Sequence, residues 1–319
     1  MMRWLFDGLA GSGPGARLTV LMFHRVNPLP DELFPSEVHR QSFDTICGWV
    51  RAWFQVLPLS EAVMRLQNQS LPSRAMAITF DDGYADNHDV ALPVLQRHGL
   101  NATFFVSTGF LDGGRMWNDT VIEAVRHAQV QHIDLRADAL PALRAVFDLG
   151  TVTARRAAVQ RLIAAVKYEE PQARLAHVQR IAHAARAHLP DGLMMTSQQV
   201  QALHRAGMQL GAHTHNHPIL SNLDDAAAME EIGRSRRVLE GLLDASVEHF
   251  AYPNGKPGVD YTERDAALVR RLGFRTAFST APGVATVHSD PFQLPRYTPW
   301  RRHRLGFAGQ LAANLRRKT

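Results

Sequence analysis

Short apolar runs alternate with amphipathic stretches along most of this chain, and this alternation constrains the possible folds more than any other feature. Strands that alternate with helices predict a mainly parallel sheet with helical crossovers, an α/β fold. Helices are expected at 39–53, 59–67, 86–98, 196–206, 224–243 and 262–272, with Thr196 or Ser197 and Asp224 as N-caps. The candidate strands are 18–24, 76–80, 101–107, 208–213, 248–253, 275–279 and 292–296.

Two adjacent carboxylates stand where the second of these strands ends. Residues 79–84 read Thr-Phe-Asp-Asp-Gly-Tyr, so the chain turns at Gly83 and both Asp81 and Asp82 project above the strand end. Crowded carboxylates repel unless a cation or a shared proton intervenes. The pattern indicates a metal site in which one carboxylate binds the ion and the other transfers protons. The alternative is an Asp-Gly turn of the kind common between strands and helices.

A dense histidine cluster follows another apolar run, in residues 211–218, which read Gly-Ala-His-Thr-His-Asn-His-Pro. A single turn brings His213 and His217 to one side and leaves His215 aimed elsewhere. Two neutral imidazoles and one carboxylate leave coordination positions open, as catalytic zinc sites do. Non-haem iron centres use the same ligand types, so the ligands do not identify the metal.

Together the two segments resemble the first two motifs of the polysaccharide deacetylases, the carbohydrate esterase family 4 or NodB-homology group. The resemblance covers most of residues 18–300. It implies that Asp81 is the general base and that a divalent metal is bound, usually zinc, with cobalt, nickel or iron as alternatives. By the same resemblance the metal ligands are Asp82, His213 and His217, and the motifs are supported by Thr214 and Gly83.

Residues 250–255, Phe-Ala-Tyr-Pro-Asn-Gly, resemble a degenerate third motif of this family. Many members carry an arginine shortly before the proline and a tyrosine after it. This chain has Ala251 and Asn254, which leaves the arginine partner of the base unassigned. Pro253, Asn254 and the backbone near Tyr84 are expected at the substrate or the oxyanion.

The general acid is expected at the N-terminal strand. The fifth family motif is Leu-x-His, but the matching residues here are Leu294, Pro295 and Arg296. Residues 18–26 instead resemble the Tyr-His-x-Val opening of the poly-N-acetylglucosamine deacetylase branch, in which the motif order is permuted. His24 is therefore the candidate acid, and the alternative is a partly buried histidine that caps the strand.

The resemblance implies a distorted (β/α)7 barrel, and the candidate residues lie at the carboxyl ends of the predicted strands, the functional face of such barrels. The expected organisation is an N-terminal segment (1–17), the deacetylase domain (18–300) and a basic tail (301–319). A helical insertion is expected at about 118–195, with helices near 143–149 and 154–167. Trp117, which precedes it, is either a sugar-stacking platform or a buried side chain.

Composition sets limits on location and partners. The lone Cys47 excludes an internal disulfide and thiolate metal sites. The first residues lack the apolar core of a secretory signal, so a cytoplasmic protein is expected. Net charge is +5, with basic residues in the tail such as Arg301, Arg316 and Lys318. That tail is either a peripheral contact with an anionic membrane or a solvated basic helix, and no nucleic-acid partner is expected.

These residues predict a metal-dependent enzyme that removes acetyl groups from N-acetylated sugars, in exopolysaccharide or cell-envelope glycan synthesis. One rival is a carbohydrate-binding module that has lost turnover, favoured by the altered third motif and the absent Leu-x-His. The other is a hydrolase of the same superfamily that cleaves a non-sugar C–N bond.

Overall fold

The computed structural model describes residues 2–317, which form two compact units. The first, here the barrel unit, comprises residues up to Leu29, Val38–Asp112 and the chain from Met194 onward. The second, here the insert unit, comprises Pro30–Glu37 and Gly113–Leu193. The predicted insertion, 118–195, falls mainly in the insert unit.

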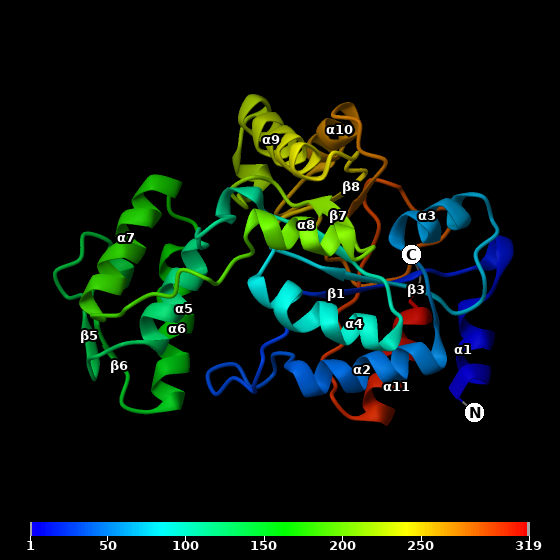
Figure 1. Ribbon diagram of the computed structural model, residues 1–319. Coiled ribbons are helices and arrows are strands. Elements are labelled where there is room, and N and C mark those ends of the chain that lie inside the picture. Colours follow the sequence, from blue (N-terminus) through cyan, green and yellow to red (C-terminus); the bar gives the residue numbers. More distant parts are fainter. Residues whose placement is uncertain (1, 318–319) are drawn as a thin grey trace. The chain divides into compact units, whose positions relative to one another are not determined.

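A parallel, seven-stranded sheet organises the barrel unit (Figure 1). Its main path runs β1-β3-β4-β7-β8-β9, and β2 pairs with the start of β3. All residues of β1 and β3 are buried, as expected for parallel strands that are covered on both faces. The strands are β1 Thr19–Phe23, β2 Gln55–Val56, β3 Ala75–Phe80, β4 Thr103–Val106, β7 Gln209–Ala212, β8 His249–Ala251 and β9 Thr276–Phe278.

The strand predicted at 292–296 is wrong, because this segment makes only isolated bridges. Leu294 N donates to Ala277 O (2.9 Å) and Tyr297 N donates to Val20 O (2.8 Å), so the segment links β9 to β1. Pro291 and Pro295 have no amide hydrogen, which prevents a continuous ladder. These bridges curl the sheet into the expected distorted barrel.

Helices flank the sheet at nearly the predicted positions. Thr196 caps α8 by accepting from Gln199 N, and Asp224 caps α9 by accepting from Ala227 N. The helix predicted at 86–98 begins with a π-helical turn, Asn87–Ala91. No helix within 2–317 has both the length and the apolarity that a bilayer span requires. The helices of this unit are α1 Met2–Ala10, α2 Arg40–Trp53, α3 Leu59–Gln67, α4 Leu92–His98, α8 Ser197–Arg205, α9 Asp225–Leu243, α10 Glu263–Arg271 and α11 Arg304–Leu315.

The basic C-terminal segment is not a fully solvated helix. Phe307, Leu311 and Leu315 of α11 are buried in the main core, where α11 packs against α1. Arg316 and Arg317 remain exposed, and Lys318 lies outside the described residues. One face of the tail helix is therefore part of the fold.

Aromatic packing fixes the strand ends that carry the candidate site. The Phe80 ring, at the end of β3, stacks on Phe104 with ring centroids 4.8 Å apart. It also contacts Phe23 (5.5 Å) and Phe43 (5.6 Å). Because Phe23 and Phe104 belong to β1 and β4, three neighbouring strands are packed together directly beneath the site.

The insert unit has its own core. It consists of α5 Trp117–Arg126, α6 Val152–Val166, α7 Pro171–Ala184 and an antiparallel pair, β5 His132–Asp134 and β6 Val146–Asp148. The helix predicted at 154–167 is present, whereas the one at 143–149 is wrong. Residues 146–148 alternate exposed, buried and exposed, with Phe147 opposite Ile133, and this period of two is that of a β-strand.

Candidate active site

The predicted residues gather at the carboxyl edge of the sheet. His24, Asp81 and His213 each follow directly on the last residue of β1, β3 and β7, and Pro253 comes two residues after β8. In parallel α/β barrels this edge carries the functional groups. The structure therefore brings together residues that are far apart in the sequence.

The turn after β3 separates the two carboxylates. Asp82 and Gly83 both have left-handed backbone conformations, with φ of 78° and 91°. A Cβ atom on Gly83 would lie 3.0 Å from Val106 Cγ1, so both the conformation and the space require glycine. Asp81 N donates to Phe23 O at 2.9 Å. Asp81 and Asp82 are 2% and 7% exposed, yet they meet different partners.

Asp81 is paired with Arg296, which is fully buried. Nη1 and Nη2 of Arg296 donate to the two carboxylate oxygens, each at 2.6 Å, and Nε donates to Ser279 O at 3.1 Å. Burial raises the pKa of Asp81, but the positive charges of Arg296 and His213 outweigh it and lower that pKa below its usual range. The bidentate guanidinium therefore keeps Asp81 ionised.

Asp82 faces the two histidines. Its Oδ1 lies 3.3 Å from His213 Nε2 and 3.4 Å from His217 Nε2. One ligand atom from each residue lies within 4.8 Å of the others. Asp82 Oδ1 is buried and has no hydrogen-bond partner among the described residues. An unpartnered buried carboxylate oxygen beside two ring nitrogens is a donor set that fits a divalent cation such as zinc.

Hydrogen bonds orient the first histidine for coordination. Nδ1 of His213 donates to Ala251 O at 2.7 Å, so in the neutral imidazole Nε2 is the nitrogen without a proton, and it faces Asp82. Burial lowers the pKa of His213, but Asp81 and Asp82 outweigh it and raise that pKa. Burial lowers the pKa of His217 to about 4, so this imidazole is neutral, as a metal ligand must be.

A compact turn returns the chain from His213 to His217. Thr214 and His217 have positive φ angles of 62° and 54°. Thr214 Oγ1 accepts from His217 N at 3.1 Å and donates to His213 O at 2.6 Å. The Thr214 hydroxyl thus links His213 and His217, the first and last residues of the histidine motif.

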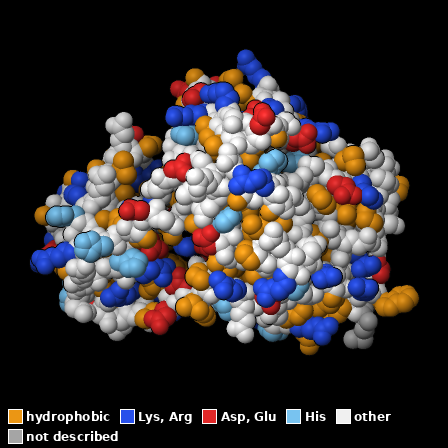
Figure 2. All heavy atoms as spheres, in the orientation of Figure 1, with side chains coloured by type: hydrophobic (Ala, Val, Ile, Leu, Met, Phe, Trp, Pro, Cys, Tyr) orange, Lys and Arg blue, Asp and Glu red, His pale blue; other side chains and the backbone are white. Residues whose placement is uncertain are grey.

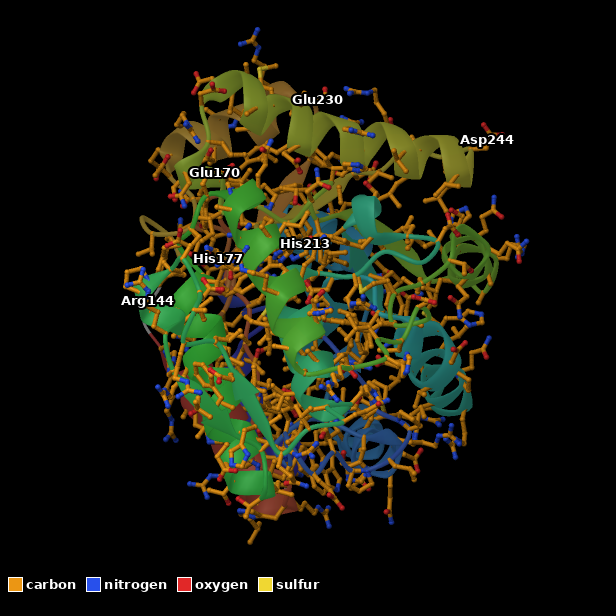
Figure 3. All side chains as sticks on the ribbon, turned by 90° about the vertical axis from the view of Figure 1, so that its left-hand side faces the viewer. Arg144, Glu170, His177, His213, Glu230 and Asp244 are labelled. Carbon is orange, nitrogen blue, oxygen red and sulfur yellow. The ribbon has the colours of Figure 1, made fainter. Side chains whose placement is uncertain are left out.

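Glu231 holds the outside of this turn, a role that the sequence reasoning missed. Its carboxylate accepts from His215 N (3.0 Å) and Asn216 N (2.7 Å), and Asn216 Nδ2 donates to it at 2.7 Å. Figure 3 shows α9, the helix that carries Glu231, crossing above His213. His215 itself points away to Thr108 Oγ1 (2.9 Å), as predicted. A mid-helix glutamate carries no sequence signal for such a contact.

The loop that bears His24 is tied to the segment after β3. Asn87 Nδ2 donates to His24 O at 2.8 Å, and Val26 N donates to Asp86 Oδ1 at 3.0 Å. The His24 side chain is exposed, so it is not the buried strand cap of the alternative interpretation. His24 directly follows Phe23, which pairs with Phe80 just before Asp81, so His24 and Asp81 stand at the ends of neighbouring strands.

The residues predicted to contact substrate have different environments. Tyr84 is buried under the Arg25 guanidinium, which lies 4.9 Å from the ring centroid. Pro253 is buried, whereas Asn254 is exposed in a loop closed by Thr280 Oγ1, which donates to Asn254 O at 2.8 Å. Trp117 belongs to the insert unit, where its ring is half-buried and the Arg174 guanidinium lies 4.9 Å from its centroid.

Comparisons with known proteins agree with this fold. The family model "Polysaccharide deacetylase" matches residues 68–134 and 145–277, more than half of the chain. YxkH of Bacillus subtilis (strain 168), which is named as a polysaccharide deacetylase, is 20% identical over 283 residues, which cover 88% of this chain and 71% of that protein.

Solved structures show the same fold at low sequence identity. The Streptococcus pyogenes deacetylase PplD in complex with acetate superposes with a TM-score of 0.58 at 19% identity, over 89% of this chain and 92% of that one. IcaB from Ammonifex degensii superposes with a TM-score of 0.57 at 20% identity, over 96% of this chain and 98% of that one. The BpsB deacetylase domain from Bordetella bronchiseptica superposes with a TM-score of 0.55 at 16% identity, over 88% of this chain and 95% of that one.

The extended match to the family model and the carboxyl-edge cluster of two aspartates and two histidines lead to one conclusion. The chain belongs to the polysaccharide deacetylase family and is a carbohydrate N-deacetylase.

Proposed function

We propose that this enzyme is a metal-dependent hydrolase that removes N-acetyl groups from amino sugars of a polysaccharide or lipid-linked glycan. Its place would be in exopolysaccharide or cell-envelope glycan biosynthesis, in the cytoplasm. The observation that carries the proposal is that the two adjacent carboxylates have different partners. Asp81 is bound by a guanidinium, whereas Asp82 presents an unpartnered oxygen to two imidazoles.

The metal would be held by Asp82, His213 and His217, with zinc as the first candidate and cobalt, nickel or iron as alternatives. When bound there, a divalent metal supplies Lewis acidity toward the acetamide carbonyl and lowers the pKa of water toward about 7. The protein's part is to fix these donors. The hydrogen bond that His213 Nδ1 donates to Ala251 O and the one that His217 N donates to Thr214 Oγ1 do this.

Asp81 would act as the general base. Its carboxylate is ionised and held rigidly by Arg296, so it is available to take a proton from the attacking water. The guanidinium also orients both carboxylate oxygens in advance, so the carboxylate need not reorient during the reaction. Arg296 thus takes the place of the arginine that is missing from the third motif.

His24 would act as the general acid and protonate the departing amine. An amine leaves poorly as an anion, so a positioned proton donor is needed. Support for this role comes from the exposure of His24 and from its loop, which is tied to the segment after β3 and follows the strand next to the one that carries Asp81. The backbone near Tyr84 and the loop at Pro253 and Asn254 would face the substrate.

The direct test is acetate release from N-acetylglucosamine oligomers and from lipid-linked precursors. The wild-type enzyme is expected to release acetate, and Asp82→Asn and Asp81→Asn are expected to abolish release. Arg275→Gln, which changes an exposed side chain of the same unit, serves as the control. Fractionation of the native cells tests the proposed location.

Two outcomes would favour the rival functions. Glycan binding that survives Asp81→Asn, with no acetate released by the wild type, would indicate a binding module. Bound metal without acetate from any sugar would indicate a non-sugar C–N substrate. The intact Asp81–Arg296 pair favours catalysis, because a binding module has no need of an ionised carboxylate held in this way.

A further inference from the structure

The start of α1 and the start of α11 lie side by side in an exposed patch of the barrel unit. Met2, Arg3, Ala52, Trp53, Arg304 and Leu305 line a shallow pocket of about 520 Å³, to which α1, α2 and α11 all contribute. Beside it, Trp4 is 82% exposed, Leu5 42% and Leu305 72%. We name Arg3, Trp4, Leu5, Arg304 and Leu305 the terminal patch.

The terminal patch combines apolar and positive groups. Figure 2 shows hydrophobic and basic side chains side by side at the lower right of the molecule, over α1 and α11. Residues 300–317 include five arginines and no acidic residue. The acidic residue of α1, Asp7, is paired with Arg74 at 2.6 Å. Large exposed apolar side chains in one place mark an interaction surface.

An anionic bilayer matches this chemistry better than a second copy of the chain does. Tryptophan is enriched at the boundary of membranes, where its ring sits at the headgroup level, and arginines attract anionic lipids. A symmetric dimer through the same patch would bring two positively charged surfaces together, which is unfavourable.

The patch lies at the opposite edge of the sheet from the active site. Arg74 immediately precedes β3 and donates to Trp53 O at 2.7 Å, so the pocket lies at the start of that strand. Asp81 follows the last residue of β3. A strand of this length spans about 20 Å. Docking through the terminal patch would therefore leave the catalytic edge facing away from the bilayer.

We propose that the terminal patch docks the enzyme on anionic phospholipid membranes, with Trp4, Leu5 and Leu305 inserted at the headgroup level and Arg3 and Arg304 bound to phosphates. In this orientation the enzyme acts on glycan that extends away from the surface. Catalysis on soluble oligomers does not depend on docking.

The test is flotation of the full chain with vesicles of phosphatidylcholine alone or mixed equally with phosphatidylglycerol. The wild type is expected to float with the anionic vesicles only, and added salt weakens this binding. Trp4→Ser combined with Leu305→Ser is expected to reduce binding about tenfold or more, and so is Arg3→Gln combined with Arg304→Gln. Circular dichroism checks that each variant is folded.

Matched controls separate the patch from general effects. Met64→Ser removes an apolar side chain that is 48% exposed on α3, and Arg275→Gln removes an exposed charge, and both should bind like wild type. Acetate release from soluble oligomers should be equal in all variants. Absence of vesicle binding by the wild type overturns the proposal, as does binding that both double variants retain. A concentration-dependent dimer that Trp4→Ser disrupts, without vesicle binding, would also overturn it, in favour of a second copy.

Discussion

Replacing Arg296 by glutamine should move the acidic limb of the pH–rate profile to higher pH. The base must be ionised to act, and the guanidinium of Arg296 holds both oxygens of Asp81 at 2.6 Å. Opposite charges about 4 Å apart interact by about 4 kcal/mol at an effective dielectric constant near 20. This attraction stabilises the ionised form of Asp81 and so lowers its pKa.

The pKa of Asp81 is therefore expected to be higher in Arg296→Gln than in the wild type. Asp81 protonates at higher pH in this variant, so activity is lost at a higher pH as the solution is acidified. The assay is acetate release as a function of pH, with Arg275→Gln as control. An acidic limb at the wild-type pH in Arg296→Gln would refute the role of Asp81 as base or of Arg296 as its partner.

Stability provides a second measurement on the same pair. Removal of Arg296 alone leaves a buried carboxylate without its partner, which costs about 3–5 kcal/mol in the free energy of unfolding. Combining Asp81→Asn with Arg296→Gln should recover much of that loss. If Arg296→Gln does not fold, Arg296→Lys keeps the charge and loses the bidentate geometry, so a smaller shift of the acidic limb is expected.

Three further changes test other parts of the site. His24→Ala should lower kcat by about 10²–10⁴-fold and remove the alkaline limb, and survival of both limbs would show that another group is the acid. Gly83→Ala should lower the melting temperature more than Gly99→Ala does, because both positions have positive φ but only at Gly83 does a Cβ meet Val106; equal effects would contradict this reasoning. Glu231→Gln should weaken metal binding about 10–100-fold in a chelator competition, since its carboxylate holds the histidine turn; unchanged affinity would limit Glu231 to a role in folding.

The sequence was sufficient for the features that depend on local pattern. The buried strands β1 and β3 read as apolar runs because both of their faces are covered. The caps at Thr196 and Asp224 were recognisable because their side chains bond amides three residues ahead. Asp82, His213 and His217 could be assigned to one cluster because parallel strands end at one edge.

Features that depend on distant partners could not be read from the sequence. Arg296 drew attention only because it stands where the family's fifth motif has a histidine. Nothing in the sequence around it indicates that its guanidinium pairs with Asp81. The hairpin residue Phe147 was assigned to a helix because its pairing with Ile133 depends on the insert unit's core. At 292–296 the apolar pattern predicted a strand, but the prolines limited it to single bridges.

The measurement that tests the central claim most directly is the metal content of the purified enzyme beside its acetate release. We predict about one divalent metal per chain in the wild type and loss of both metal and activity in His217→Ala. The matched control, His215→Ala, removes an imidazole that faces Thr108 and should retain the metal. A wild-type enzyme that releases acetate without metal, or a His217→Ala variant that keeps both, would contradict the account.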